Sequence, residues 1–73
     1  MMRVRHNDTT VVLSKTATST YDVSTFDGRH LGFVTRVRPQ SSRWRASWRE
    51  DGITRSVEGA TRVAAVCALM DAR

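Results

Sequence analysis

Two Asp-Gly pairs divide the chain into strand-length segments, and they constrain the fold more than any other feature. Asp27-Gly28 and Asp51-Gly52 each lie between strand-like runs, and Asp-Gly favours a two-residue type I′ hairpin turn. Between the two pairs, residues 39–42 read Pro-Gln-Ser-Ser, which is typical of a loop. The spacing therefore predicts an antiparallel meander. Its strands are expected over residues 20–26, 30–38, 43–50 and 53–57.

After Gly59 the apolar residues change from a period of two to a period near 3.6, which predicts a helix over residues 62–72. Thr61 is a suitable N-cap for it. One stripe along this helix is apolar and consists of Val63, Val66, Cys67 and Met70, with Leu69 alongside it. A chain of 73 residues supports one domain, so we expect an α+β fold: a three- to four-stranded antiparallel meander sheet with the C-terminal helix packed on one face.

The N-terminal segment, residues 1–19, has two interpretations, and the sheet-plus-helix domain is expected over residues 20–73. The first interpretation is a strand hairpin that turns at Asn7-Asp8. The second is a flexible arm that becomes ordered on binding. Residues 14–20 are small and polar, so flexibility is expected there.

The charge balance favours a polyanionic partner. Twelve basic residues against seven acidic residues give a net charge of +5, and all the basic residues except Lys15 are arginine. The planar guanidinium group suits phosphates and guanine edges. From Gly28 through Arg49 there is no acidic residue. Each close pair of like charges there costs on the order of a few kcal/mol before screening, so an anion bound to this segment would stabilise it.

Residue parity divides each expected strand into two faces, because side chains alternate across a strand. In 43–49 the apolar face holds Trp44, Ala46 and Trp48, and the opposite face holds Arg43, Arg45, Ser47 and Arg49. In 31–38 one face holds Leu31, Phe33 and Val37, and the other holds Val34, Arg36 and Arg38. We expect both apolar sets to lie under the helix, which leaves the arginines on the open face of the sheet.

Each face of the expected sheet has two possible interpretations. The arginines are either a polyanion-binding surface or a solvated strand face whose charges guard against aggregation. Trp44 and Trp48 are either core residues or, if the helix packs elsewhere, platforms on which single-stranded bases stack.

The order of residues over 33–70 resembles the plant AP2/ERF DNA-binding domain and the AP2-like N-terminal domains of phage and transposon integrases. The resemblance lies in "FVTRVRPQSSRWRASW", the turn "EDG" and "RSVEGATRVAAVCAL". The shared pattern is an R-x-R pair, a short loop, a basic-aromatic strand, a hairpin, and an Ala-rich helix after a threonine. Those places are held here by Arg36 and Arg38, Arg43-Trp44, Ala46, Trp48-Arg49, Val57, Thr61, and Ala65, Val66, Ala68 and Leu69.

The resemblance implies that a three-stranded sheet enters the major groove, with open-face arginines on bases and phosphates and the helix packed behind. The matching arginines are Arg36, Arg38 and Arg49, with Ser47 where the family often has glutamate. The loop at residues 40–42 departs from the family, which has a tryptophan and a glycine there, so base preference is not carried over.

Catalytic chemistry is not indicated, and we expect a non-enzyme without a cofactor or a metal. His6 and His30 are isolated, and the glycines form no phosphate-binding loop. His30 follows a turn and is interpreted as a strand-end residue or an anion contact. Cys67 lies on the apolar helix stripe and is expected to be a core residue. The lone cysteine and the absence of an apolar span lead us to expect a cytoplasmic protein, nucleoid-associated or in a host cell if phage-encoded, without a membrane partner.

The leading hypothesis is a small basic protein that binds double-stranded DNA. The candidate nucleic-acid-binding residues are Arg36, Arg38, Arg43, Arg45, Ser47, Arg49 and Arg55. The alternative is a small phage-type protein-interaction module that binds a host protein or forms a homodimer by strand pairing through the N-terminal strand at residues 9–13. A third possibility is RNA or single-strand binding on the tryptophans.

Overall fold

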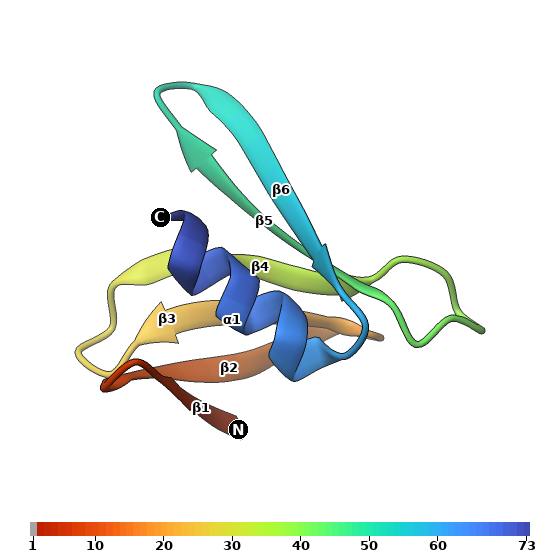
Figure 1. Ribbon diagram of the computed structural model, residues 1–73, viewed down its shortest axis with the longest axis horizontal. Helices are drawn as coiled ribbons and strands as arrows, with labels where there is room; N and C mark the ends of the chain where they lie inside the picture. The colour runs from red at the N-terminus through yellow and green to blue at the C-terminus, as the bar shows by residue number, and fades with distance from the viewer. Residues whose placement is uncertain (1) are drawn as a thin grey trace.

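The computed structural model describes residues 2–73, which form one antiparallel sheet crossed on one face by a single helix (Figure 1). The elements are β1 (Met2–His6), β2 (Thr9–Ala17), β3 (Thr20–Thr25), β4 (His30–Arg36), β5 (Trp44–Glu50), β6 (Ile53–Gly59) and α1 (Arg62–Ala72). The predicted α+β class and C-terminal helix are confirmed. The predicted strand number is wrong, because the sheet has six strands in the order β1-β2-β3-β4-β5-β6.

The two additional strands come from the N-terminal segment, for which the structure shows the hairpin and not the flexible arm. Asn7 and Asp8 both have positive φ, 50° and 63°, as a type I′ turn requires. β2 pairs with β1 on one side and with β3 on the other, and Val11 and Leu13 of β2 are fully buried. Residues 14–20, expected to be flexible, are therefore largely strand. Pairing of Ser14, Lys15 and Ala17 with β3, together with the buried apolar half of β2, outweighs their polar composition.

The two Asp-Gly pairs form different turns. Asp51 and Gly52 both have positive φ, 53° and 78°, so the type I′ prediction holds between β5 and β6. Between β3 and β4 it is wrong, because only Gly28 has positive φ. Gly28 N donates to Thr25 O at 3.0 Å, and Thr25 N donates to Arg29 O at 2.8 Å. These bonds close a three-residue loop, which the Thr25 hydroxyl braces by accepting from Arg29 N at 2.9 Å and donating to the Asp27 carboxylate.

The core lies between the sheet and α1. The Thr61 hydroxyl caps the helix by accepting from Ala64 N at 3.0 Å. Its buried face differs from the predicted stripe, because Val63 is exposed while small Ala65 faces the sheet. The helix can pack closely against the end of β6 because Gly59 has no side chain. A Cβ at that position would lie 2.4 Å from Ala65 N. The buried apolar residues are Val4, Val11, Leu13, Val23, Val34, Trp44, Ala46, Trp48, Ala65, Val66 and Leu69.

The face assignment of β4 is opposite to the predicted one. Val34 pairs with Ala46 and is fully buried under the helix, whereas Phe33 pairs with Ser47 and is 40 % exposed on the open face. Phe33 and Val34 are adjacent, so either parity gives β4 an apolar core face, and parity alone does not choose between them. A bulge after Val23 in the β3–β4 pairing lets Leu31 also reach the core. The consequence for the site is that Arg36, paired with Trp44, lies on the helix side.

The β5–β6 hairpin diverges from the rest of the sheet (Figure 1). β5 pairs with β4 only from Trp44 to Ser47 but pairs with β6 along its whole length. Gly32 lies where the strands separate, and a Cβ there would be 2.3 Å from Ser47 O. The opposite end of β5 is joined to β4 by the loop of residues 37–43, and it is there that the arginines gather.

Candidate nucleic-acid interface

The open face of β5 carries arginines, as its parity predicts. Arg45 and Arg49 are exposed on the side opposite Trp44, Ala46 and Trp48, and Arg43 precedes the strand with the same parity. Ser47 shares this face but is only 6 % exposed, because it lies between Phe33 and Ser56 of the neighbouring strands. Its hydroxyl is therefore poorly placed to contact a ligand.

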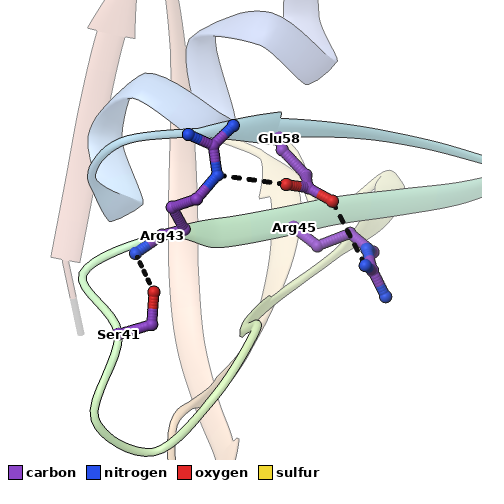
Figure 2. Close-up of polar contacts among 4 residues, drawn as sticks. All are labelled: Ser41, Arg43, Arg45 and Glu58. Carbon is purple, nitrogen blue, oxygen red and sulfur yellow. Dashed lines mark hydrogen bonds and ion pairs between the residues drawn. The ribbon is translucent and has the colours of Figure 1, made fainter.

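Glu58 of β6 joins two of these arginines (Figure 2). Arg43 Nε donates to Glu58 Oε1 at 3.2 Å, and Arg45 Nη2 donates to Glu58 Oε2 at 3.1 Å. The hydrogen bond from Arg45, followed by that from Arg43, holds the pKa of the Glu58 carboxyl below its ordinary value. One carboxylate balances one of the two guanidinium charges, so the trio keeps a net positive charge while both arginines are held in position.

The β4–β5 loop, residues 37–43, forms a hollow beside this trio. It is closed by backbone bonds from Val37 N to Arg43 O and from Ser41 N to Arg38 O, both 3.0 Å, and Arg43 N donates to Ser41 Oγ at 3.0 Å (Figure 2). The hollow has a volume of about 690 Å³ and is open to solvent. It is lined by Val37, Arg38, Pro39, Gln40, Ser41 and Arg43, which offer guanidinium, amide and hydroxyl donors to an anion.

A second pair of arginines lies on the helix side of the same end of the sheet. The Arg36 guanidinium carbon is 5.3 Å from the centroid of the Trp44 ring, and Arg36 Nη1 donates to Pro39 O at 3.1 Å. The Arg62 guanidinium carbon is 4.7 Å from the Tyr21 ring and 5.6 Å from the Trp44 ring. Arg62 Nε is buried without a hydrogen-bond partner among the residues described, a situation that typically costs about 1–3 kcal/mol or more.

Sequence reasoning missed Arg62. Its signal was present: Arg62 directly follows the N-cap threonine, where the helix macrodipole disfavours a cation. A basic residue there, with no acidic residue in the first turn, indicates that something else must stabilise it.

The seven candidate residues therefore do not form one surface. Arg38, Arg43 and Arg45 come together at the β4–β5 loop. Arg49 lies farther along the open face and donates to Gly52 O at 3.1 Å. Arg36 was expected on the open face but lies on the helix side, and so does Arg55, a further candidate residue. Arg55 pairs with Trp48 across the hairpin and forms an ion pair with Glu50 at 3.3 Å.

The tryptophans are core residues. Trp44 is 7 % and Trp48 5 % exposed, so neither presents a ring face to a passing base. This confirms the core alternative and removes the structural basis for base stacking on these rings, on which the single-strand hypothesis depended.

Residues 2–73 contain no cluster of three or more His, Cys, Asp or Glu side chains arranged to hold a metal ion. Over the same residues, α1 is too short to span a membrane. No protein-family model, curated protein or solved structure matches the chain.

Proposed function

We propose that the protein binds double-stranded DNA through the arginines of β5 and the β4–β5 loop. The observation that carries the proposal is the imbalance of charge at this end of the sheet. Arg36, Arg38, Arg43 and Arg45 lie at this end, and among the residues described Glu58 is the only carboxylate that forms an ion pair with any of these four. Excess positive charge concentrated on one end of a small protein attracts polyanions.

The chemistry of the donors favours nucleic acid over a general anion. Guanidinium groups bind phosphate oxygens and guanine edges in a bidentate manner. A two-stranded antiparallel ribbon fits the B-DNA major groove, which is about 12 Å wide. β4 and β5 are flanked by β3 and β6 in the sheet, whereas the β5–β6 hairpin continues beyond Ser47 as such a ribbon. Arg45 and Arg49 lie on the open side of β5, with Arg43 just before it and Arg38 in the β4–β5 loop. The resemblance of residues 33–70 to AP2-like domains supports the same partner.

A salt titration on duplex DNA tests the proposal. If about five phosphates are neutralised, log affinity should fall with log salt at a slope near −4 to −5. Arg38→Ala and Arg45→Ala should each weaken binding. Arg29→Ala is the matched control, because Arg29 is exposed in the loop at the other end of β4. Absence of binding at low salt, or a slope near zero, would contradict the proposal and favour the solvated-face interpretation.

A second candidate, strand addition by a protein partner, is supported by the exposed edge at β6. The segment 9–13 lies in β2 between two strands, so strand pairing would use an edge strand, β1 or β6. Residues 53–56 of β6 are all exposed, and Ile53 is 58 % exposed, which suits an added strand. Size-exclusion chromatography and capture from nuclease-treated lysate separate the two functions. A partner or dimer that survives nuclease and is lost in Ile53→Lys supports strand addition.

A further inference from the structure

We propose that Arg36 and Arg62 together bind one DNA backbone phosphate on the helix side of the sheet, so that the duplex holds the β4–β5 loop end from both faces. This inference rests on the proposed function. It adds a contact on the face opposite Arg43 and Arg45, and it brings in a residue, Arg62, that comes from the helix.

Trp44 is the element that brings the two arginines together. Both guanidinium groups lie against this ring, with their carbons 5.3 and 5.6 Å from its centroid. Trp44 is itself fixed by burial and by the Tyr21 ring, whose centroid is 6.1 Å away. Guanidinium groups over aromatic faces are held in position by cation–π attraction and keep their charge. They therefore remain able to bind an anion.

The local charge is not balanced within the protein. Neither Arg36 nor Arg62 forms an ion pair with a carboxylate anywhere in residues 2–73. Lys15 adds a third cation. It pairs with Tyr21 across β2 and β3, so its side chain lies on the same face of the sheet as that of Tyr21. Arg62 is partly buried, and its Nε has no hydrogen-bond partner among residues 2–73. A bound phosphate would supply the missing negative charge.

The position of the pair makes a phosphate of the same duplex the appropriate anion. Arg36 Nη1 bonds to Pro39 O, so the helix-side pair adjoins the loop that carries Arg38 and Arg43. B-DNA carries about one phosphate charge per 1.7 Å of helix axis, so a duplex that contacts Arg38 and Arg43 in the loop has further phosphates close to Arg36 and Arg62 at the same end of the sheet.

The test measures salt slopes on duplex DNA for Arg36→Gln, Arg62→Gln and the double variant, with Arg29→Gln as the control. Because both arginines bind one phosphate, the double variant should lose about one unit of slope, and not the roughly two units of two independent contacts. Each single variant should weaken binding about three- to tenfold at 0.1 M salt, and the control should leave binding unchanged. Urea unfolding confirms that each variant is folded. If Arg62→Gln does not fold, the exposed Arg36→Gln still tests the helix-side contact, because wild-type slope and affinity in that variant would contradict it.

Fluorescence gives an independent result. In Trp48→Phe protein, Trp44 is the remaining tryptophan, and its emission should change on adding duplex DNA but change less in the Arg36→Gln background. Wild-type slope and affinity in the Arg36 and Arg62 variants, with Trp44 emission unaffected by DNA, would overturn this inference while leaving DNA binding intact. If the wild-type protein does not bind duplex DNA at all, the proposed function fails, and this inference with it.

Discussion

Two pairs of arginines lie on opposite faces at the same end of the sheet, and they are held in different ways. On the open face, Arg43 and Arg45 share the Glu58 carboxylate. On the helix side, Arg36 and Arg62 lie against the rings of Trp44 and Tyr21. A carboxylate positions a guanidinium group and cancels charge, whereas an aromatic ring positions it without cancelling charge. The helix-side pair therefore keeps more of its charge for a ligand.

The two arrangements also depend on different parts of the fold. The open-face trio is exposed and linked across two strands, so salt screens it and its loss should hardly affect folding. The aromatic arrangement depends on a buried tryptophan that is part of the core. Substitutions on the two faces should therefore separate effects on stability from effects on DNA binding.

The largest expected effect is on stability, from Trp44→Ala. Removing a buried tryptophan typically costs about 3–5 kcal/mol, a large share of the stability of a small domain. Here both helix-side arginines also lose their contact with the Trp44 ring. Urea unfolding should show a much lower midpoint or an unfolded chain. Trp44→Phe keeps an aromatic face and should be milder. By contrast, Arg43→Gln with Arg45→Gln should leave the midpoint nearly unchanged. Equal midpoints for Trp44→Ala and that double variant would remove the distinction between the two faces.

The next effect concerns DNA affinity. Arg43→Gln with Arg45→Gln removes two independent open-face contacts, so the salt slope should decrease by about two units. The helix-side double variant should lose about one. Fluorescence anisotropy on a labelled duplex measures both under identical conditions. A loss of two units from each pair would mean that the helix-side arginines contact separate phosphates.

The sequence predicts part of this comparison correctly. Alternation in β5 places its arginines opposite the two tryptophans, because only one parity there is apolar. The Thr61 cap and the helix over residues 62–72 are also confirmed, since the capping and periodicity signals are local. The resemblance of residues 33–70 stays a prediction, because the comparisons gave no match.

The features of the fold and of the site that the sequence did not predict depend on tertiary packing. Phe33 and Val34 give β4 two possible apolar faces, and pairing with Ala46 selects Val34, which moves Arg36 to the helix side. The polar half of β2 becomes strand because β3 pairs with it at Ser14, Lys15 and Ala17, whereas β1 pairs only with residues 9–13. Arg62 joins Arg36 only because the helix crosses the sheet at Trp44, which no local pattern specifies.

A smaller effect is expected when the open-face pair loses its carboxylate. Glu58→Gln removes one negative charge beside Arg43 and Arg45, so duplex affinity should rise several-fold at low salt, with a slope steeper by up to about 0.9. Within the described part of the chain, no carboxylate forms an ion pair with Arg36 or Arg62. Asp71→Asn, which removes a negative charge at the other end of α1, is the control and should have little effect. Weaker binding in Glu58→Gln would show that Glu58 acts mainly by positioning the arginines.

The smallest effect is a pH dependence of stability at the open-face pair, which the helix-side pair should not share. Hydrogen bonds from Arg45 and then Arg43 lower the pKa of Glu58 from its ordinary 4.5. A carboxyl with a lower pKa in the folded state stabilises the fold fully above its unfolded pKa, and this stabilisation is lost as pH falls through the folded value. Urea midpoints of wild type and Glu58→Gln should thus differ slightly at pH 7, and the difference should shrink progressively as the pH falls below the ordinary value of 4.5. Asp27, whose pKa the Thr25 hydroxyl and the Arg29 N–H also lower, is present in both proteins and cancels from the comparison. Arg36→Gln should show no such convergence, and a Glu58→Gln difference that did not shrink at all as the pH fell below 4.5 would contradict a charge-based role for this carboxylate.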